Sequence, residues 1–268
     1  MSETNQFDLQ KLNDHGSLKS VTFLETTPST NDWAKQKIQQ SGLADKLVKE
    51  CPKLLLTERQ TAGRGQMNRN WWSGQGSLTF SIIETFPDST PNLTTSLATA
   101  LALTELICGI DCNIEPRIKW PNDLFVNGRK LGGILIETVR HQGTGFKIVG
   151  IGINVNNSLS HLPEAVRKSA ISLQEITGKH QDMTPFLTNL LDRYFAVQNR
   201  CQTEPKKVVQ DCLNRSQHTL GEPLCFRLPD GRSINGEFAG YSVRGGVLIK
   251  QNESPAEFLS GTIELPHY

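Results

Sequence analysis

An Asn-Gly pair at residues 127 and 128 constrains the fold of this chain more than any other short stretch. It separates two apolar runs, at 123–126 and 131–136, that are long enough to form strands. Asn-Gly favours the type I′ turn, which needs a positive φ at both central residues and joins two antiparallel strands directly. The sequence therefore predicts an antiparallel β-hairpin near the middle of the chain.

Strand and helix patterns are mixed along the first 218 residues. Runs rich in β-forming residues predict strands at 20–25, 54–57, 77–85 and 146–156. Helical periods and helix boundary signals predict helices at 29–42, 93–110, 171–177, 185–200 and 204–212. This mixed order is typical of an α+β or α/β domain.

From about residue 220 the pattern changes to short β runs with turn sequences between them, at 224–228, 236–242 and 247–250. Such spacing predicts a small all-β, barrel-like domain. We therefore expect three parts: a flexible, loosely ordered segment at 1–18, a larger mixed domain at 19–218, and the β domain at 219–268.

Composition argues against several classes of protein. The net charge is +1, from 28 basic and 27 acidic residues, whereas a nucleic-acid-binding protein usually has a strongly basic balance or face. The N-terminus lacks the apolar segment of an export signal, and no run of 18 apolar residues occurs, so we expect a cytoplasmic protein without a membrane span. The six cysteines include no Cys-x-x-Cys pair, so we expect reduced thiols and no structural metal.

Residues 58–72 combine glycines with cations, since Gly63 and Gly65 flank Arg64 and Arg69 follows. Glycine lets the backbone turn sharply and approach a ligand closely. The arginine fork suits carboxylates and phosphates. Two cations on one glycine-containing loop favour an anionic ligand between them. The alternative is a solvated, mobile surface loop that happens to be basic.

Three further places pair a glycine or a helix start with polar side chains. Ser29 and Asp32 form a capping-box pattern at a helix start, which either caps the helix or presents polar groups to a ligand. The glycines at 132–133, next to Lys130, predict a bulge or a close approach of a ligand or another backbone. The stretch 150–154, Gly-Ile-Gly-Ile-Asn, lacks the third glycine of a Rossmann fingerprint and the Gly-Lys-Ser/Thr of a P-loop. No Ser-His-Asp or Cys-His arrangement is evident, so we expect chemistry by positioning and charge stabilisation.

Several short motifs stand in the same order as in the biotin protein ligases, also called biotin–[acetyl-CoA-carboxylase] ligases, and over residues 20–268 the chain resembles that family. The motifs are Ser29-Thr30-Asn31, Gly63-Arg64-Gly65, Lys119-Trp120-Pro121-Asn122-Asp123, Lys130-Leu131-Gly132-Gly133-Ile134-Leu135, Gly150-Ile151-Gly152-Ile153-Asn154 and Ser172-Leu173-Gln174-Glu175. The resemblance implies an α+β fold, with a mixed-sheet catalytic domain, flanking helices and a small SH3-like C-terminal domain.

The resemblance also implies a two-step reaction. ATP and biotin would give biotinyl-5′-AMP and pyrophosphate, and a lysine of a biotin carboxyl carrier protein would then take the biotinyl group and release AMP. The first step brings a carboxylate against the α-phosphate, and these two anions repel. Arg64, Arg69 and Lys130, with Mg²⁺, would offset that repulsion.

The family pattern implies a role for each matching position. Lys130 and Arg64 would be catalytic, and Asp123 would hold the magnesium ion. The implied biotin-binding residues are Ser29, Thr30, Asn31, Gln60, Gly63, Arg64, Gly65, Gln66, Lys130 and Gly133. The implied ATP-binding residues are Arg64, Arg69, Trp71, Lys119, Asn122, Asp123, Lys130, Gly152 and Asn154. For Trp71 the alternative is a hydrophobic residue that anchors the loop.

The chain departs from the family pattern at three positions. Many relatives read Gly-Arg-Gly-Arg-x-Gly-Arg, but here Gln66 and Asn68 replace the second arginine and the third glycine. Glutamine carries no charge, which predicts an adenylate that escapes more easily. Asparagine tolerates positive φ better than most residues, so we expect the loop turn to survive. Leu213 stands where some relatives carry a tryptophan that stacks on the nucleotide.

Two other functions stay open, a lipoate or octanoate ligase of the same fold and a non-catalytic biotin-binding module. Some family members carry an N-terminal DNA-binding domain, but fewer than 20 residues precede the first predicted strand here. We therefore expect no sequence-specific DNA binding. The expected partners are biotin and the carrier protein, without a membrane, and a homodimer is left open.

Overall fold

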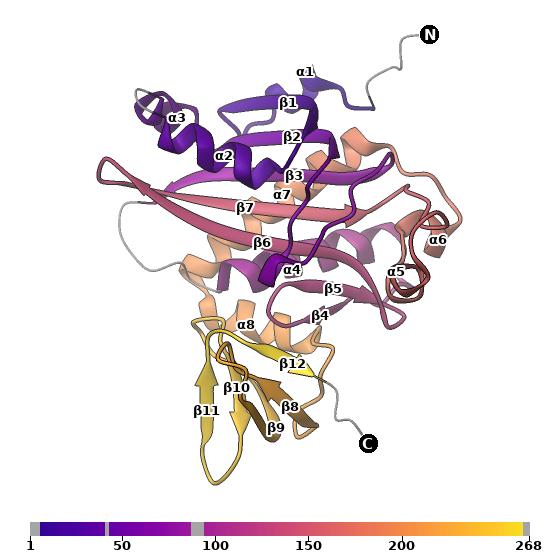
Figure 1. Ribbon diagram of the computed structural model, residues 1–268, viewed down its shortest axis with the longest axis vertical. Coiled ribbons are helices and arrows are strands. Elements are labelled where there is room, and N and C mark those ends of the chain that lie inside the picture. The colour runs from indigo at the N-terminus through magenta and orange to yellow at the C-terminus, as the bar shows by residue number, and fades with distance from the viewer. Residues whose placement is uncertain (1–5, 41–42, 87–93, 265–268) are drawn as a thin grey trace. The chain divides into compact units, whose positions relative to one another are not determined.

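The structure is a computed structural model that describes residues 6–40, 43–86 and 94–264 (Figure 1). The chain divides into two compact units, and each contains two separate stretches of sequence. The first unit comprises residues 1–91 and 128–192, and the second comprises residues 92–127 and 193–268. The predicted boundaries at 18/19 and 218/219 fall between secondary-structure elements and do not coincide with the borders of these units.

The first unit is built on a mixed β-sheet. Its strands, in spatial order, are β1 (Ser20–Thr27), β2 (Lys53–Gln60), β3 (Ser77–Phe86), β7 (Thr144–Asn154) and β6 (Arg129–His141). The β1–β2 pair is parallel, whereas β2–β3, β3–β7 and β6–β7 are antiparallel. The predicted α+β class with a mixed sheet is confirmed.

Short helices accompany this sheet. They are α1 (Leu9–Asn13), α2 (Thr30–Gln39), α3 (Ala44–Glu50), α5 (Glu164–Ser169) and α6 (Leu173–Thr177). Ser29 and Ser172 cap the N-termini of α2 and α6, and Gly178 ends α6 in the left-handed conformation. Helix α1 departs from the prediction of a loosely ordered segment at 1–18. Phe7 and Leu12 are buried there, and this apolar pair orders the part of the segment that the structure describes.

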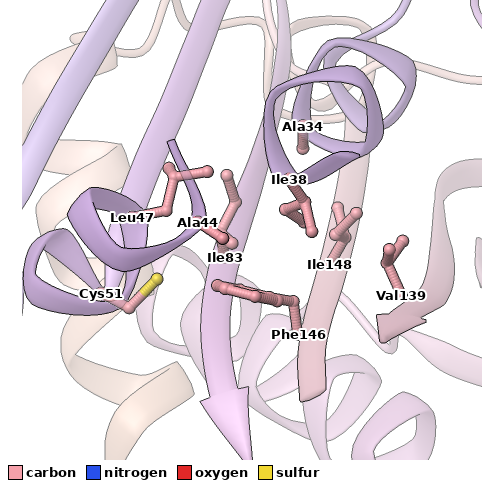
Figure 2. Packing of buried hydrophobic residues seen from close by; sticks show 9 residues of the cluster. All are labelled: Ala34, Ile38, Ala44, Leu47, Cys51, Ile83, Val139, Phe146 and Ile148. Atoms are coloured by element: carbon pink, nitrogen blue, oxygen red, sulfur yellow. The ribbon is translucent and has the colours of Figure 1, made fainter. Parts of the chain in front are cut away.

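Helix α2 covers one end of one face of the sheet. Ala34 and Ile38 on its lower side pack over Ile83 of β3 and over Phe146 and Ile148 of β7 (Figure 2). Ala44, Leu47, Cys51 and Val139 complete this buried cluster. Burying the larger of these side chains, the leucine, isoleucines, valine and phenylalanine, contributes about 1.5–3 kcal/mol each. The cluster therefore fixes α2 on the sheet and with it the direction of the helix N-terminus.

The second unit joins helices to a small β-sheet. It contains α4 (Thr94–Ile110), β4 (Arg117–Lys119), β5 (Asp123–Val126) and α8 (Pro205–Asn214), while α7 (Met183–Thr203) runs through both units. The five-stranded sheet has the order β11 (Pro255–Phe258), β10 (Val247–Lys250), β9 (Ser233–Tyr241), β8 (Pro223–Arg227) and β12 (Thr262–Glu264). All its pairs are antiparallel, which confirms a separate C-terminal β-sheet.

Trp120, in the turn between β4 and β5, links this small sheet to the rest of the second unit. Its side chain is 2% exposed, and its indole Nε1 donates to the Gly245 carbonyl at 2.9 Å. Its ring centroid lies 5.8 Å from that of Phe226. The buried Ser216 and Tyr241 hydroxyls, 2.9 Å apart, make a second link between this sheet and the rest of the unit. A tryptophan read in the sequence as part of a ligand motif thus anchors the β-sheet.

The turn at 127–128 has the predicted backbone, with φ of 52° at Asn127 and 72° at Gly128. The glycines at 132–133 do not form a bulge, because Gly132 pairs with Ile153 and Gly133 with Gly152 in an unbroken register. A side chain on Gly132 would lie 2.9 Å from the Gly152 carbonyl oxygen. Of the predicted reasons for a glycine at 132, the structure therefore supports the close approach of another backbone, that of β7.

The six cysteines are all free thiols. Burial raises the pKa of the Cys51 thiol to about 12, so this sulfur stays protonated at neutral pH. Among the described residues, no group of three His, Cys, Asp or Glu side chains could hold a metal ion. Within the same residues, every helix is too short or too polar to cross a bilayer.

Candidate ligand site

The sheet face beneath α2 changes character along its length. Ser81 of β3 pairs with Gly150 of β7, which pairs in turn with Leu135 of β6, so these three residues share one face. Two residues further along each strand, toward the N-terminus of α2, the same face carries Thr79, Gly152 and Gly133. The apolar end of this face is covered by α2, while the other end offers hydroxyls and glycines.

The first residues of α2 lie over this polar end. The Thr30 backbone N–H donates to Gln60 Oε1 at 2.7 Å, and the Thr30 hydroxyl lies 3.2 Å from the same oxygen. Ser81 Oγ is 2.7 Å from both Thr30 Oγ1 and Asn31 Oδ1. All four side chains are at most 8% exposed. The predicted residues Thr30, Asn31 and Gln60 thus meet in one buried polar network, to which Ser81 adds a hydroxyl that was not expected.

Asn31 is held from several sides. Its amide Nδ2 donates to the Leu135 carbonyl at 3.1 Å and to Glu137 Oε2 at 2.9 Å. A Cβ added to Gly150 would lie 2.4 Å from Asn31 Oδ1. Glycine at 150 is therefore required by the Asn31 amide. The neighbouring Ser29 accepts a hydrogen bond from Asp32 N at 3.3 Å, so Ser29 caps the helix.

The arginine loop, which we define as residues 63–71, is a closed loop with paired ends. The Trp71 N–H donates to the Gly63 carbonyl at 2.9 Å, and the Gly65 N–H donates to the Arg69 carbonyl at 2.7 Å. Arg64 and Asn70 form an antiparallel bridge between these two bonds. A short 3₁₀ turn at 66–68 makes the tip, and its left-handed residue is Met67, with φ 54°.

Arg64 already has anionic partners within the protein. Its Nε donates to Asp32 Oδ2 at 2.8 Å, and its Nη2 contacts the other Asp32 oxygen. The same Nη2 lies 3.4 Å from Glu137 Oε2. Lys35 Nζ completes the group, at 2.8 Å from Glu137 and 3.1 Å from Asp32. We call Asp32, Lys35, Arg64 and Glu137 the charge cluster, and its formal charges sum to zero.

Arg69 differs from Arg64. It is exposed, and no ion pair to it is found among the described residues. The sequence predicts an anion near the two loop arginines. At Arg64 that anion is supplied by the protein itself, through the carboxylates of Asp32 and Glu137. Arg69 is the loop cation that is open to a ligand.

The pKa of Asp32 follows from this geometry. Burial alone would raise the pKa of this carboxyl, but the hydrogen bonds and positive charges of Arg64 and Lys35 outweigh it and hold the pKa below its ordinary value. A depressed carboxyl pKa stabilises the folded state above the pKa of the unfolded chain, and this contribution is lost as the pH falls through the folded value.

We therefore expect Asp32→Asn to destabilise the protein at pH 7, and the difference from wild type to shrink as the pH falls below about 4, the ordinary pKa of an aspartate. Asp32 is partly exposed, so solvent screening keeps the effect small. Denaturant unfolding of both proteins between pH 3 and pH 7 measures it. A difference that stayed constant over this range would contradict the charge pairing of Asp32.

Trp71 and Lys130 meet beside Gly152. A Cβ on Gly152 would lie 2.4 Å from the Trp71 ring, so the indole packs directly on this glycine. Lys130 Nζ lies 5.9 Å from the centroid of the Trp71 ring. The indole Nε1 is buried without a hydrogen-bond partner among the described residues. Trp71 could therefore anchor the loop or contact the nucleotide. Its ring packs between the loop and β7, the strand that carries the predicted ATP-binding residues Gly152 and Asn154.

Asn154 ends β7 next to a second amide. Its Oδ1 accepts a hydrogen bond from Asn157 Nδ2 at 3.0 Å, and both side chains are buried. Beyond Asn154, a pocket of about 930 Å³ is lined mainly by residues 72–76, 156–159, 161 and 162. The Asn157 contact orients the amide of Asn154, which the sequence alone did not indicate.

Three predicted ATP-binding residues belong to the second unit. Lys119 ends β4, Asp123 begins β5, and Asn122 is buried in the turn between these paired strands. The Asn122 N–H donates to the Lys119 carbonyl at 3.2 Å, which closes the turn. Lys119 Nζ lies 5.3 Å from the centroid of the Phe125 ring. The other predicted site residues all lie in the first unit.

Sequence reasoning missed Glu137, Ser81 and Lys35, which hold the predicted residues in place. Glu137 carries a weak signal, because a carboxylate follows the apolar run Ile134–Ile136 inside a predicted strand. Its partners become evident only through the register, which sets Leu135 opposite Gly150 and Glu137 opposite Ile148. Long-range pairing of this kind cannot be read from a local pattern.

Comparison with known proteins shows that the fold is that of a ligase of the biotin and lipoate type. Residues 23–156 match the biotin/lipoate A/B protein ligase family, to which this chain belongs. The chain is 30% identical over 201 residues to the biotin–[acetyl-CoA-carboxylase] ligase of Paracoccus denitrificans. The aligned region covers 73% of this chain and 83% of that protein. The resemblance seen in the motifs is thereby confirmed.

Two further relatives agree. The bifunctional ligase/repressor BirA of Bacillus subtilis is 32% identical over 222 residues, a match that covers 79% of this chain but 66% of that protein, just under two thirds of its length. The structure of the biotin protein ligase from Aquifex aeolicus in complex with biotin and ATP is similar, with a TM-score of 0.75 and 30% identity. It covers 93% of this chain and 100% of that chain.

Proposed function

We propose that this protein is an ATP-dependent biotin protein ligase, which forms biotinyl-5′-AMP and transfers the biotinyl group to a lysine of a biotin carboxyl carrier protein in the cytoplasm. The observation that carries the proposal is the buried network of Thr30, Asn31, Gln60 and Ser81 beside Gly150. Its donors and acceptors suit a small neutral amide-like group such as the ureido ring of biotin.

Lys130 and Arg69 are the cations we assign to the reacting groups. Lys130 lies beside Trp71 and Gly152, on the side of the sheet where the nucleotide is expected. A fixed positive charge there would stabilise the negative charge that develops when the biotin carboxylate attacks the α-phosphate. Gly152 and Asn154 are proposed to contact the adenosine part of ATP. For Lys119 and Asn122 of the second unit, contact with nucleotide phosphates stays a prediction.

Magnesium fits the residues that are present. Mg²⁺ is usually held by one or two carboxylates together with substrate phosphates and water, so it needs no preformed cage of three protein ligands. Asp123 supplies a carboxylate at the start of β5, and we propose that it holds the ion. The ion would supply charge neutralisation at the phosphates of ATP.

The test is a biotinylation assay. Incubation with ATP, Mg²⁺, biotin and a carrier domain should give a carrier whose mass has risen by one biotin. Lipoate in place of biotin should give no product, and a carrier modified by lipoate alone would favour the lipoate ligase. Tight biotin binding without modification would favour a non-catalytic module.

Gln66 gives a prediction about the intermediate. The tip of the arginine loop carries no charge at this position, so retention of biotinyl-5′-AMP depends on the remaining cations. Gln66→Arg is expected to lower the release of free biotinyl-5′-AMP by several fold. This is the effect expected if the new arginine adds one charge-assisted hydrogen bond to the adenylate. Release is measured without carrier by separating free from bound adenylate. Equal release from both proteins would remove this explanation.

A further inference from the structure

Glu137 connects three segments that are far apart in the sequence. Its two carboxylate oxygens contact the Asn31 amide at 2.9 Å, Lys35 Nζ at 2.8 Å and Arg64 Nη2 at 3.4 Å. Asn31 and Lys35 belong to α2, Arg64 belongs to the arginine loop, and Glu137 itself lies in β6. One side chain thus contacts both the helix that forms the proposed biotin pocket and the loop beside it.

These contacts are partly shielded from water. The side chains of Glu137, Lys35 and Arg64 are 22%, 27% and 31% exposed. A charge-assisted hydrogen bond in such a setting is worth more than one on an open surface. If Glu137 lost its charge, Lys35 and Arg64 would share the single carboxylate of Asp32, and the two cations would repel each other.

We propose that Arg64 is a positioning residue, and that Glu137 couples the arginine loop to the Asn31 amide so that both are preformed for biotin. Arg64 then acts through the loop that it holds, and Arg69 and Lys130 are left to meet the phosphate. Neutralising Glu137 would loosen the loop and free the Asn31 amide at the same time. The effect on biotin rests on the function proposed above, whereas the order of the loop does not.

Trypsin offers a direct readout of loop order, because the loop contains the Arg69–Asn70 bond. We compare the ligand-free wild type with Glu137→Gln, Arg64→Gln and the double variant. Cleavage at Arg69–Asn70 should be about tenfold faster in each single variant, the equivalent of roughly 1.4 kcal/mol. The effects should be less than additive in the double variant, because both changes remove the shared Arg64–Glu137 contact.

Glu84→Gln is the matched control. Glu84 lies in β3 of the same sheet and is 17% exposed. It forms an ion pair with Lys147 Nζ at 3.0 Å, and this ion pair involves neither α2 nor the arginine loop. Its cleavage rate should equal that of the wild type. An unchanged rate in Glu137→Gln, or additive effects in the double variant, would overturn the coupling.

Kinetics separate positioning from general destabilisation. Glu137→Gln is expected to raise the KM for biotin about tenfold and to change kcat much less, since the cations that meet the phosphate remain. A variant that was merely less folded would lose kcat at unchanged KM, and that result would contradict the proposal. If the wild type did not biotinylate a carrier, the proposed function would fail, while the proteolysis result would still decide the coupling.

Asp32→Asn serves if Glu137→Gln does not fold. This residue is more exposed, at 42%, and contacts the same guanidinium. It removes one side of the Arg64 contact and leaves the Asn31 amide bonded to Glu137. Faster cleavage of the loop is the expected result, with a smaller rise in the KM for biotin than in Glu137→Gln because the Asn31 contact is kept. Unchanged cleavage would show that Arg64 does not hold the loop.

Discussion

Lys130→Ala is expected to lower the rate of carrier biotinylation by about 10²–10³-fold, the usual cost of removing one preorganised group that stabilises charge in a transition state. The backbone should be unaffected, because the Lys130 carbonyl, which accepts from the Ile171 N–H at 3.0 Å, is retained. Rates are measured under saturating biotin and ATP, so that the loss reports on the chemical step and not on substrate binding.

Lys147→Ala is the control for this substitution. Lys147 lies in β7 of the same sheet and pairs with Glu84, and its side chain leaves from the face opposite to that of Ile148, which packs under α2. It should lose stability but keep its rate of biotin transfer. If Lys130→Ala retained most of the activity, or if both variants lost the same amount, Lys130 would not be the group that stabilises the reacting phosphate.

The elements of the fold could be predicted wherever a local pattern carried them. The turn at 127–128, the capped start of α2 and the end of α6 at Thr177 each follow from residues adjacent in the sequence. The short helices α1, α3 and α5 escaped prediction, because five to seven residues show too little period to be recognised. Their order depends on tertiary contacts such as the burial of Leu12.

The site shows the same division more sharply. The sequence predicts Arg64 beside a ligand, since a loop cation suits an anion, but nothing in it indicates that Arg64 also pairs with Asp32 and Glu137. Those carboxylates lie 32 and 73 positions away in the sequence. Sequence reasoning identifies which residue types suit a chemistry. It does not identify which of them already neutralise one another, because that depends on the sheet register.

Gly150→Ala is expected to raise the KM for biotin by about 10- to 100-fold, as when a buried hydrogen-bonding group is displaced from its partners. The new Cβ would lie 2.4 Å from Asn31 Oδ1 and 3.0 Å from its Cγ, so the amide must move. Moving it breaks the contacts to Ser81, Leu135 and Glu137. We also expect a loss of about 1–3 kcal/mol in the free energy of unfolding from overpacking.

Gly74→Ala separates these two effects, because a Cβ at Gly74 meets nothing within 4 Å. It should leave both the KM and the stability of the protein unchanged. Asn31→Ala should restore room for the Cβ, so that Gly150→Ala combined with it regains stability but not biotin affinity. A Gly150→Ala protein that bound biotin normally would mean that the Asn31 amide does not contact the ligand, and the buried network would then have a purely structural role.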